Sequence, residues 1–283
     1  MTGIDRLPPV PGPRAGARPG WQAQLELAFE RRAGATVLAE RRHSGPLIVQ
    51  RPFYPEGEVC HVYVVHPPGG VVAGDELALG AQVRPGAHAL LTTPAAGKFY
   101  RSEGATARLT QDFTVEAGIL EWLPQESIFY PGASALVRAT IRLRAAARFF
   151  GWEVSCLGLP ASAAPFHTGE LRQHLDLWFE TQLLLSERQH IDREAIAARW
   201  GLAGNAAIGT LLAFPATQRE LAAARTAAGA DTVLGCTLVE GVLVCRALAQ
   251  RGDRLRQAFV EIWSKVRPLL LGREPMLPRV WAT

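Results

Sequence analysis

The 283-residue sequence predicts a mainly β fold, with stacked antiparallel or β-helix-like sheets and a few helices, mostly in the C-terminal third. Three observations support this prediction. Apolar and polar residues alternate along several stretches between residues 21 and 190. Turn-forming residues such as Pro85-Gly86 and Pro131-Gly132 separate these stretches. Towards the C-terminus, the spacing of apolar residues changes to three and four, which is typical of helices.

Half-buried strands are expected wherever apolar side chains occupy every second position, since successive side chains on a strand point to opposite faces. The clearest stretches are residues 107–115, 136–144 and 171–179. In the first of them, Leu109 and Phe113 share one face, while Arg108 and Asp112 lie on the other. Many short strands of this kind, separated by turns, indicate a stacked-sheet body.

Helical additions are predicted at about residues 192–199, 216–227 and 253–271. The last of these carries an apolar stripe that includes Leu255, Phe259 and Trp263 at three- and four-residue spacing. Asp253 is expected to cap the start of this helix, and Gly272 is expected to end it.

A hairpin is predicted over residues 233–247, with Glu240-Gly241 as its two-residue turn. This register places Cys236 opposite Cys245 in a non-hydrogen-bonded pair, with Cα atoms roughly 4.5 Å apart. One interpretation of the pair is a redox or metal-binding site. The other, which we favour from the sequence, is two small buried thiols in a reducing cytosol.

The composition is that of an ordinary soluble globular protein, with 48% hydrophobic residues, 20% charged residues and a formal net charge of +4. Such a charge does not indicate nucleic-acid binding, and no run of 18 apolar residues is present to span a membrane. Residues 1–20 are rich in proline and lack the apolar stretch of a signal peptide. We therefore expect a disordered tail at 1–20, a single domain at 21–283, and a cytoplasmic location.

Catalytic motifs are largely missing. Ala96-Gly97-Lys98 resembles the end of a phosphate-binding loop, but Thr92 stands where the motif requires glycine and Phe99 where it requires serine or threonine. Neither G-x-S-x-G nor H-E-x-x-H occurs, and the histidines show no helical or zinc-finger spacing. The sequence therefore predicts neither a catalytic site nor a tightly bound cofactor, and the chain is not expected to be an enzyme.

Five carboxylates stand in apolar or glycine-rich surroundings: Asp75, Glu121, Glu126, Glu153 and Glu187. A buried carboxylate is costly unless it is paired, hydrated or bound to a cation. Pairing with an arginine is the favoured interpretation for any one of them. As a set, however, they predict a polar, hydrated passage for a divalent cation, because oxygen ligands without thiolates bind such ions weakly enough to release them.

Several segments carry a family likeness. They are residues 60–75 (CHVYVVHPPGGVVAGD), 91–102 (LTTPAAGKFYRS), 120–126 (LEWLPQE), 151–153 (GWE) followed by 156–158 (CLG), 267–273 (RPLLLGR) and 279–283 (RVWAT). Together these segments resemble the UreD (UreH) family of urease accessory proteins. The resemblance covers residues 21–283 in unbroken order. It implies a stacked β-sheet fold and a non-enzymatic scaffold or chaperone for nickel insertion into apo-urease, with a UreF-type helical accessory protein and a UreG-type GTPase as partners. Nickel is then expected in transit only, with the five carboxylates as candidates for lining its passage.

Partner contacts are expected from aromatic residues near the C-terminus. Phe259 and Trp263 on the predicted helix are candidate anchors for a helical partner, although packing of this stripe on the protein's own β body is the favoured alternative. Trp281 is the better candidate, because an ordered apolar terminus needs a surface to pack against.

Two other functions compete with the scaffold. A carboxylate-dependent, β-structured hydrolase would use a pair such as Glu121 and Glu126, but residues five apart on a strand face opposite ways and Pro124 intervenes. A nickel-storage protein would require clusters of histidine or cysteine ligands, and the sequence shows none.

Overall fold

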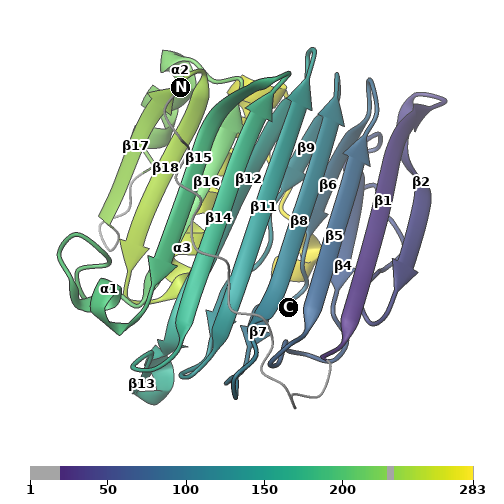
Figure 1. Ribbon diagram of the computed structural model, residues 1–283. Coiled ribbons are helices and arrows are strands. Elements are labelled where there is room, and N and C mark those ends of the chain that lie inside the picture. Colours follow the sequence, from purple (N-terminus) through teal and green to yellow (C-terminus); the bar gives the residue numbers. More distant parts are fainter. Residues whose placement is uncertain (1–19, 228–232, 283) are drawn as a thin grey trace, which may run out of the picture.

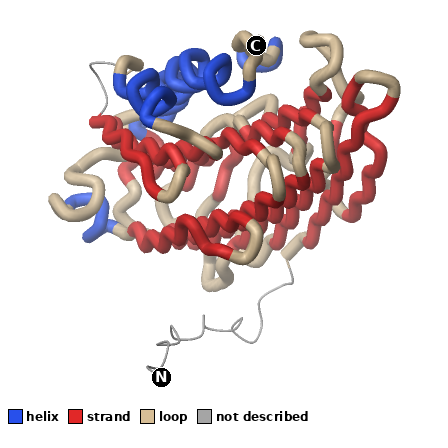
Figure 2. Tube along the Cα trace, turned by 90° about the horizontal axis from the view of Figure 1, so that it is seen from above, coloured by secondary structure: helices blue, strands red, loops and turns tan. Residues whose placement is uncertain are grey.

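The chain folds into two stacked sheets (Figures 1 and 2). Because apolar and polar side chains alternate along the strands, each sheet has an apolar inner face, and the two inner faces pack against each other. The computed structural model describes residues 20–227 and 233–282. Residues 1–19, which make up nearly all of the predicted disordered tail, lie outside the described residues.

The seven-stranded sheet faces the viewer in Figure 1. Its spatial order is β15 (Gln182–Ile191), β14 (Glu170–Phe179), β11 (Ser134–Arg144), β8 (Ala107–Glu116), β5 (Glu76–Val83), β1 (Gln22–Arg32) and β2 (Ala35–Ser44).

The second sheet has eleven strands within the described residues. Its main path runs through β17 (Val233–Val239), β18 (Val242–Ala249), β16 (Ala207–Phe214), β12 (Arg148–Leu159), β9 (Ile119–Trp122), β6 (His88–Thr92), β4 (Cys60–Val65) and β3 (Ile48–Val49). The short strands β7 (Gly97–Phe99), β10 (Ser127–Phe129) and β13 (Ala164–Pro165) pair beside this path.

The chain winds back and forth between the two sheets. From β4 to β14 the long strands alternate between the sheets, and neighbours within each sheet are parallel, as in β5–β8–β11 and β6–β9–β12. Antiparallel pairs occur towards the edges, where β2, β15 and β16–β18 are added. The predicted mainly β class is thus confirmed, with β-helix-like winding in the centre and antiparallel strands at the edges.

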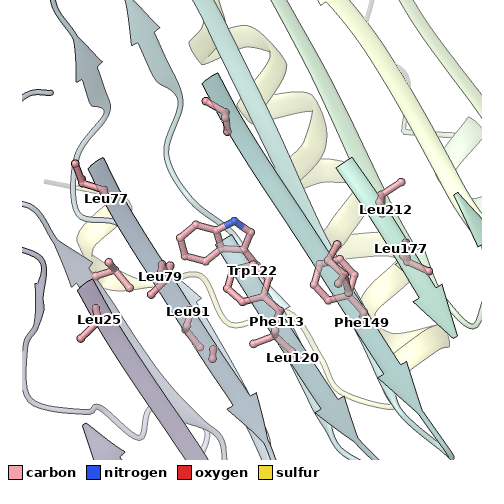
Figure 3. Packing of buried hydrophobic residues seen from close by; sticks show 14 of the residues in the cluster. Leu25, Leu77, Leu79, Leu91, Phe113, Leu120, Trp122, Phe149, Leu177 and Leu212 are labelled. Atoms are coloured by element: carbon pink, nitrogen blue, oxygen red, sulfur yellow. The ribbon is translucent and has the colours of Figure 1, made fainter. Parts of the chain in front are cut away.

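The interface between the sheets is built from the alternating apolar rows. Figure 3 shows Phe113 of β8, Trp122 of β9 and Phe149 of β12 packed in this interior, and each is at most 5% exposed. Full burial of one such side chain contributes roughly 1.5–3 kcal/mol. The rows therefore fix which face of each strand points inward, because a slip by one residue would expose the whole row.

The three α-helices lie close to their predicted positions. They are α1 (Arg193–Ala197), α2 (Gln218–Arg225) and α3 (Gly252–Leu271), and two short 3-10 helices, η1 (Pro160–Ser162) and η2 (Arg279–Ala282), accompany them. The helices α2 and α3 form a helical layer outside the second sheet, visible in blue in Figure 2, and α3 packs there against β12, β16 and β18. The short helix α1 lies apart from this layer, beside β15. No helix of the described residues is long and apolar enough to cross a membrane.

The ends of α3 agree only in part with the sequence. Gly272 ends the helix in the left-handed conformation with φ 69°, as predicted. Asp253, however, is not the cap. Arg251 takes that position without a side-chain cap, and Asp253 lies in the first turn, where its carboxylate accepts two hydrogen bonds from the Arg251 guanidinium.

The predicted hairpin and its register are confirmed. Glu240 and Gly241 form the turn between β17 and β18 with φ values of 48° and 74°, and Cys236 pairs with Cys245. Two positive φ values are what a two-residue turn of this kind requires.

Candidate functional site

A hollow of about 330 Å³ lies between the two sheets. Its apolar walls include Leu77 and Leu109 from the seven-stranded sheet and Trp122 from the other. The loops at residues 66–71 and 93–98 contribute further lining. A lined hollow of this kind inside a protein is a common location for a binding site.

A set of polar side chains continues from the hollow into an adjoining gap and is here called the polar seam: Gln111, Glu153, Gln173, Glu187, Gln189 and Thr210. Gln111 and Gln173 stand at inward positions of β8 and β14 where the apolar rows would otherwise continue. A gap of about 20 Å³ adjoins Glu153 and Gln173 and is also lined by Glu187, Gln189 and Thr210. A gap of this size holds about one water molecule.

Glu153 is the central charged group of the polar seam. Burial raises the pKa of its carboxyl to about 7; a hydrogen bond with Gln111 opposes this shift, and the nearby charge of Glu187 adds to it. Its Oε1 atom is buried and has no hydrogen-bond partner among the described residues, and the same holds for Oε1 of Gln111. Two unpartnered oxygens around one hollow create a place for a water molecule or a cation.

Glu187 lies at the outer end of the polar seam, with its side chain 15% exposed. Its Oε1 accepts a hydrogen bond of 2.7 Å from Nε of Arg246 and one of 3.1 Å from Nε2 of Gln189. Arg246 is in register with Thr210, which in turn is in register with Glu153. The Glu187–Arg246 ion pair therefore links β15, the edge strand of the seven-stranded sheet, to β18 of the second sheet at the outer end of the polar seam.

Glu121 belongs to a different and fully engaged cluster. His88 and Trp263 donate hydrogen bonds of 2.8 and 2.7 Å to its two oxygens, and Arg267 donates three more at 2.9–3.2 Å. Burial alone would raise the pKa of Glu121, but His88 and Arg267 outweigh it and lower the pKa to about 2. With five hydrogen bonds to its two oxygens, this carboxylate anchors α3 to β9.

The cluster around Glu121 extends beyond it. Arg267 also donates to Glu56 at 2.9 Å, and Glu56 lies 2.7 Å from Nε2 of His61. Arg267 is fully buried, although it is an arginine. A signal for it exists in the sequence, because it follows Trp263 by four residues and so lies on the apolar stripe of α3.

Comparison with known proteins identifies the family. The profile described as UreD urease accessory protein matches residues 22–282. The urease accessory protein UreD of Klebsiella aerogenes is 42% identical over 279 residues, covering 98% of this chain and all of that protein. UreD of Pseudomonas entomophila is 45% identical over 269 residues, with coverage of 94% and 96%.

The chain belongs to the UreD family. The resemblance read from the sequence is thereby confirmed. Two of the UreD-like segments, residues 60–75 and 91–102, contribute the loops that line the hollow. Within them, Gly70 lies against the ring of Tyr100, where any added Cβ would approach ring atoms to about 2.1 Å, so a larger residue would displace the ring. Lys98 lines the hollow itself.

The remaining two candidate carboxylates lie outside the polar seam. Asp75 accepts hydrogen bonds from the backbone amides of Trp21 at 2.8 Å and Val72 at 2.9 Å, and so fixes the loop beside the hollow. Glu126 forms an ion pair of 3.5 Å with Arg256 on α3. Of the five predicted carboxylates, the structure brings only Glu153 and Glu187 together. The described residues contain no group of three or more histidine, cysteine or acidic side chains that could hold a metal ion.

The two candidate anchors on α3 require a correction. Phe259 and Trp263 are fully buried, because the stripe packs on the protein's own second sheet, so they are not accessible to a partner. Trp281 is half-buried: its ring lies 5.9 Å from that of Trp152 and 6.2 Å from that of Trp263, and its Nε1 donates to Thr92. A partner contact at Trp281 stays a prediction.

Proposed function

We propose that this UreD-family chain is a non-enzymatic, cytoplasmic accessory protein that helps to insert nickel into apo-urease. In this proposal it acts as a scaffold for a UreF-type helical protein and a UreG-type GTPase, and nickel passes along the polar seam. The family membership supports the accessory role. The observation that carries the nickel passage is the buried carboxylate of Glu153, whose Oε1 has no hydrogen-bond partner among the described residues, with Glu187 beside it.

The chemistry of the polar seam suits transient handling of a divalent cation. Two carboxylates and several amide oxygens offer oxygen ligands only, and such ligands hold nickel less tightly than imidazole or thiolate does. The hollow itself is lined by further polar side chains, which are His66, Thr93, Lys98, Gln125, Ser127 and Ser155. Because oxygen ligands bind weakly, a cation could bind at Glu153 and then be released past Glu187 without being held tightly at either position.

The hydrolase alternative has no geometric support. The oxygens of Glu121 accept hydrogen bonds from His88, Trp263 and Arg267, and Glu126 forms an ion pair with Arg256. A general acid or nucleophile must be able to reach a substrate. Neither carboxylate of the proposed pair is free to do so.

The passage is tested by removing both seam carboxylates with Glu153→Gln and Glu187→Gln in one chain. We expect several-fold less nickel in urease and correspondingly lower urease activity, because glutamine keeps the shape of each side chain but loses the charge that attracts the cation. Nickel content and activity of the matured urease are the measurements. Asp75 stays intact, since its backbone contacts would confound the result.

A matched control carries the same change of charge on exposed residues, Glu194→Gln with Glu261→Gln. Both chains must first be shown to assemble with urease and the accessory partners by co-purification. Normal nickel content with the seam variant, together with normal assembly, would remove the polar seam from the nickel path while leaving the scaffold role standing.

The scaffold role has its own test in co-expression with the UreF-type partner. We expect the two proteins to elute together from a size-exclusion column, because a scaffold must hold its partner stably. The single proteins, run separately, serve as the reference for elution volume. Two proteins that always elute apart would contradict the scaffold role.

A further inference from the structure

The hairpin β17–β18 at the edge of the eleven-stranded sheet carries two facing thiols. Cys245 is fully buried among outer-face residues such as Leu243 and Ala247, beneath the helical layer. Cys236 is half-buried on the same face of the edge strand. Both thiols are free. They lie on the opposite face of the sheet from the polar seam, so the proposed nickel passage does not use them.

The hairpin register brings these thiols to bridging distance. Val239 and Val242 flank the turn, so counting outward makes Cys236 and Cys245 a non-hydrogen-bonded pair. The Cα atoms of such a pair are roughly 4.5 Å apart. Disulfides span Cα separations of about 4.4–6.8 Å. The two sulfurs can therefore be joined without rearranging the strands.

The surroundings give the two thiols different roles. The hydrogen bond from the Cys245 thiol lowers the pKa of Cys236, and burial opposes this effect while the charge of Arg225 adds to it. The guanidinium of Arg225 is held in place by a 3.1 Å hydrogen bond to the carbonyl of Cys236. The same thiol–thiol hydrogen bond and burial raise the pKa of Cys245. Cys236 is thus the accessible nucleophile, and Cys245 is the second thiol that stays protonated.

The other two cysteines lack this arrangement. Cys60 stands opposite Ala89, and Cys156 lies between Ile128 and Ala207. Burial raises the pKa of both thiols, that of Cys60 to about 11. They are buried, unpaired thiols in the same chain and serve as internal references.

We propose that Cys236 and Cys245 form a reversible cross-strand disulfide by exchange with a small-molecule disulfide such as oxidised glutathione. The Cys236 thiolate attacks one sulfur of oxidised glutathione, which breaks its S–S bond and releases one glutathione thiolate. Cys245 then gives up its proton and attacks the Cys236 sulfur of the mixed disulfide, releasing the second glutathione. Two protein thiols are oxidised, and one molecule of glutathione disulfide is reduced to two of glutathione. Under reducing conditions the pair stays open, and it closes when the glutathione pool becomes oxidised.

The test equilibrates the purified full-length chain with buffers that range from fully reduced to fully oxidised glutathione. Acid quenching, denaturation and alkylation with N-ethylmaleimide follow, and intact mass and peptide mapping are the readouts. We expect oxidised buffers to protect Cys236 and Cys245 from alkylation together, with a mass lower by two hydrogens before alkylation. Cys60 and Cys156 should remain fully alkylated, and reduced glutathione should restore both protected thiols.

Single variants separate the steps. Cys156→Ser should still close the bridge, since its position lies outside the pair. Cys245→Ser should retain one glutathione on Cys236, because the thiol that displaces it has been removed, and Cys236→Ser should carry neither bridge nor adduct. The proposal is overturned if both thiols of the folded wild-type chain remain fully alkylated in the most oxidised buffer. It is equally overturned if wild-type Cys236 keeps its glutathione without forming the bridge.

Discussion

Replacing Glu121 with glutamine is expected to lower the free energy of unfolding by about 3–5 kcal/mol. The glutamine fills the same space but removes the negative charge that faces the fully buried guanidinium of Arg267. Glu56, which is shared with His61, then remains as the only carboxylate in contact with this guanidinium among the described residues. Urea denaturation followed by circular dichroism measures the change.

Two further variants show whether charge is the cause. Glu126→Gln removes the ion pair with Arg256, which is partly exposed at both ends, and should cost about 1 kcal/mol or less. Combining Glu121→Gln with Arg267→Met should destabilise less than Glu121→Gln alone, because the buried guanidinium is removed together with its partner and Glu56 keeps its contact with His61. A Glu121→Gln variant as stable as Glu126→Gln would contradict the anchoring role of Glu121.

The pH dependence of this contribution follows from the lowered pKa. The folded-state pKa of about 2 lies below the ordinary value of 4.5, so the stabilisation by Glu121 is fully present above about pH 4.5. It is lost as the pH falls from there towards 2, because the folded protein must then protonate a carboxylate that holds three donors. Glu121→Gln should therefore be less sensitive to acid over this range than the wild type.

Replacing Glu153 with glutamine is expected to stabilise the protein at pH 8 and to leave its stability nearly unchanged at pH 4. The pKa of Glu153 is raised from 4.5 to about 7, so the folded state favours the protonated carboxyl. The stability associated with this group is present below about pH 4.5 and is lost as the pH rises through 7. One pKa unit corresponds to about 1.4 kcal/mol, so the full shift amounts to roughly 3 kcal/mol at pH 8.

Thermal or urea unfolding at the two pH values measures this difference. Glu187→Gln is the control, because it removes a neighbouring carboxylate that is partly exposed and paired with Arg246. It should give no comparable gain at pH 8. An equal effect of Glu153→Gln at both pH values would show that Glu153 is not a strained buried acid. A gain in stability that accompanies poorer nickel insertion would indicate that the seam holds this charge for function at the expense of stability.

The sequence predicted local structure well because local structure depends on local patterns. The rows in residues 107–115 and 171–179 became β8 and β14, and the turn at Glu240-Gly241 set the pairing of the two cysteines. The parallel winding was harder to read, because an alternating strand looks the same whether its neighbour is parallel or antiparallel. Whether two neighbouring strands are parallel or antiparallel depends on which sheet each strand joins, and the sequence of a single strand does not determine this.

The candidate site was predicted in part for the same reason. Glu153 and Glu187 stood out as acids in apolar segments, but their meeting depends on packing between sheets. Gln111 and Gln173 were detectable as polar gaps in otherwise apolar rows and were overlooked. The partner of Glu121 could not be found locally, since Arg267 is 146 residues away and only the docking of α3 brings them together.

The same contact has a consequence for how the protein is made. During translation, Glu121, His88 and the sheet residues Phe150 and Trp152 are synthesised long before Arg267. Until α3 has emerged, Glu121 lacks its donors Trp263 and Arg267, and a broad apolar face of the second sheet is uncovered, which is a surface on which unfinished chains associate with one another. The second sheet is therefore covered only after α3 (Gly252–Leu271) has been synthesised. A chain truncated before Arg267 would contain every strand of the described residues, since β18 ends at Ala249, but it would remain prone to aggregation and proteolysis.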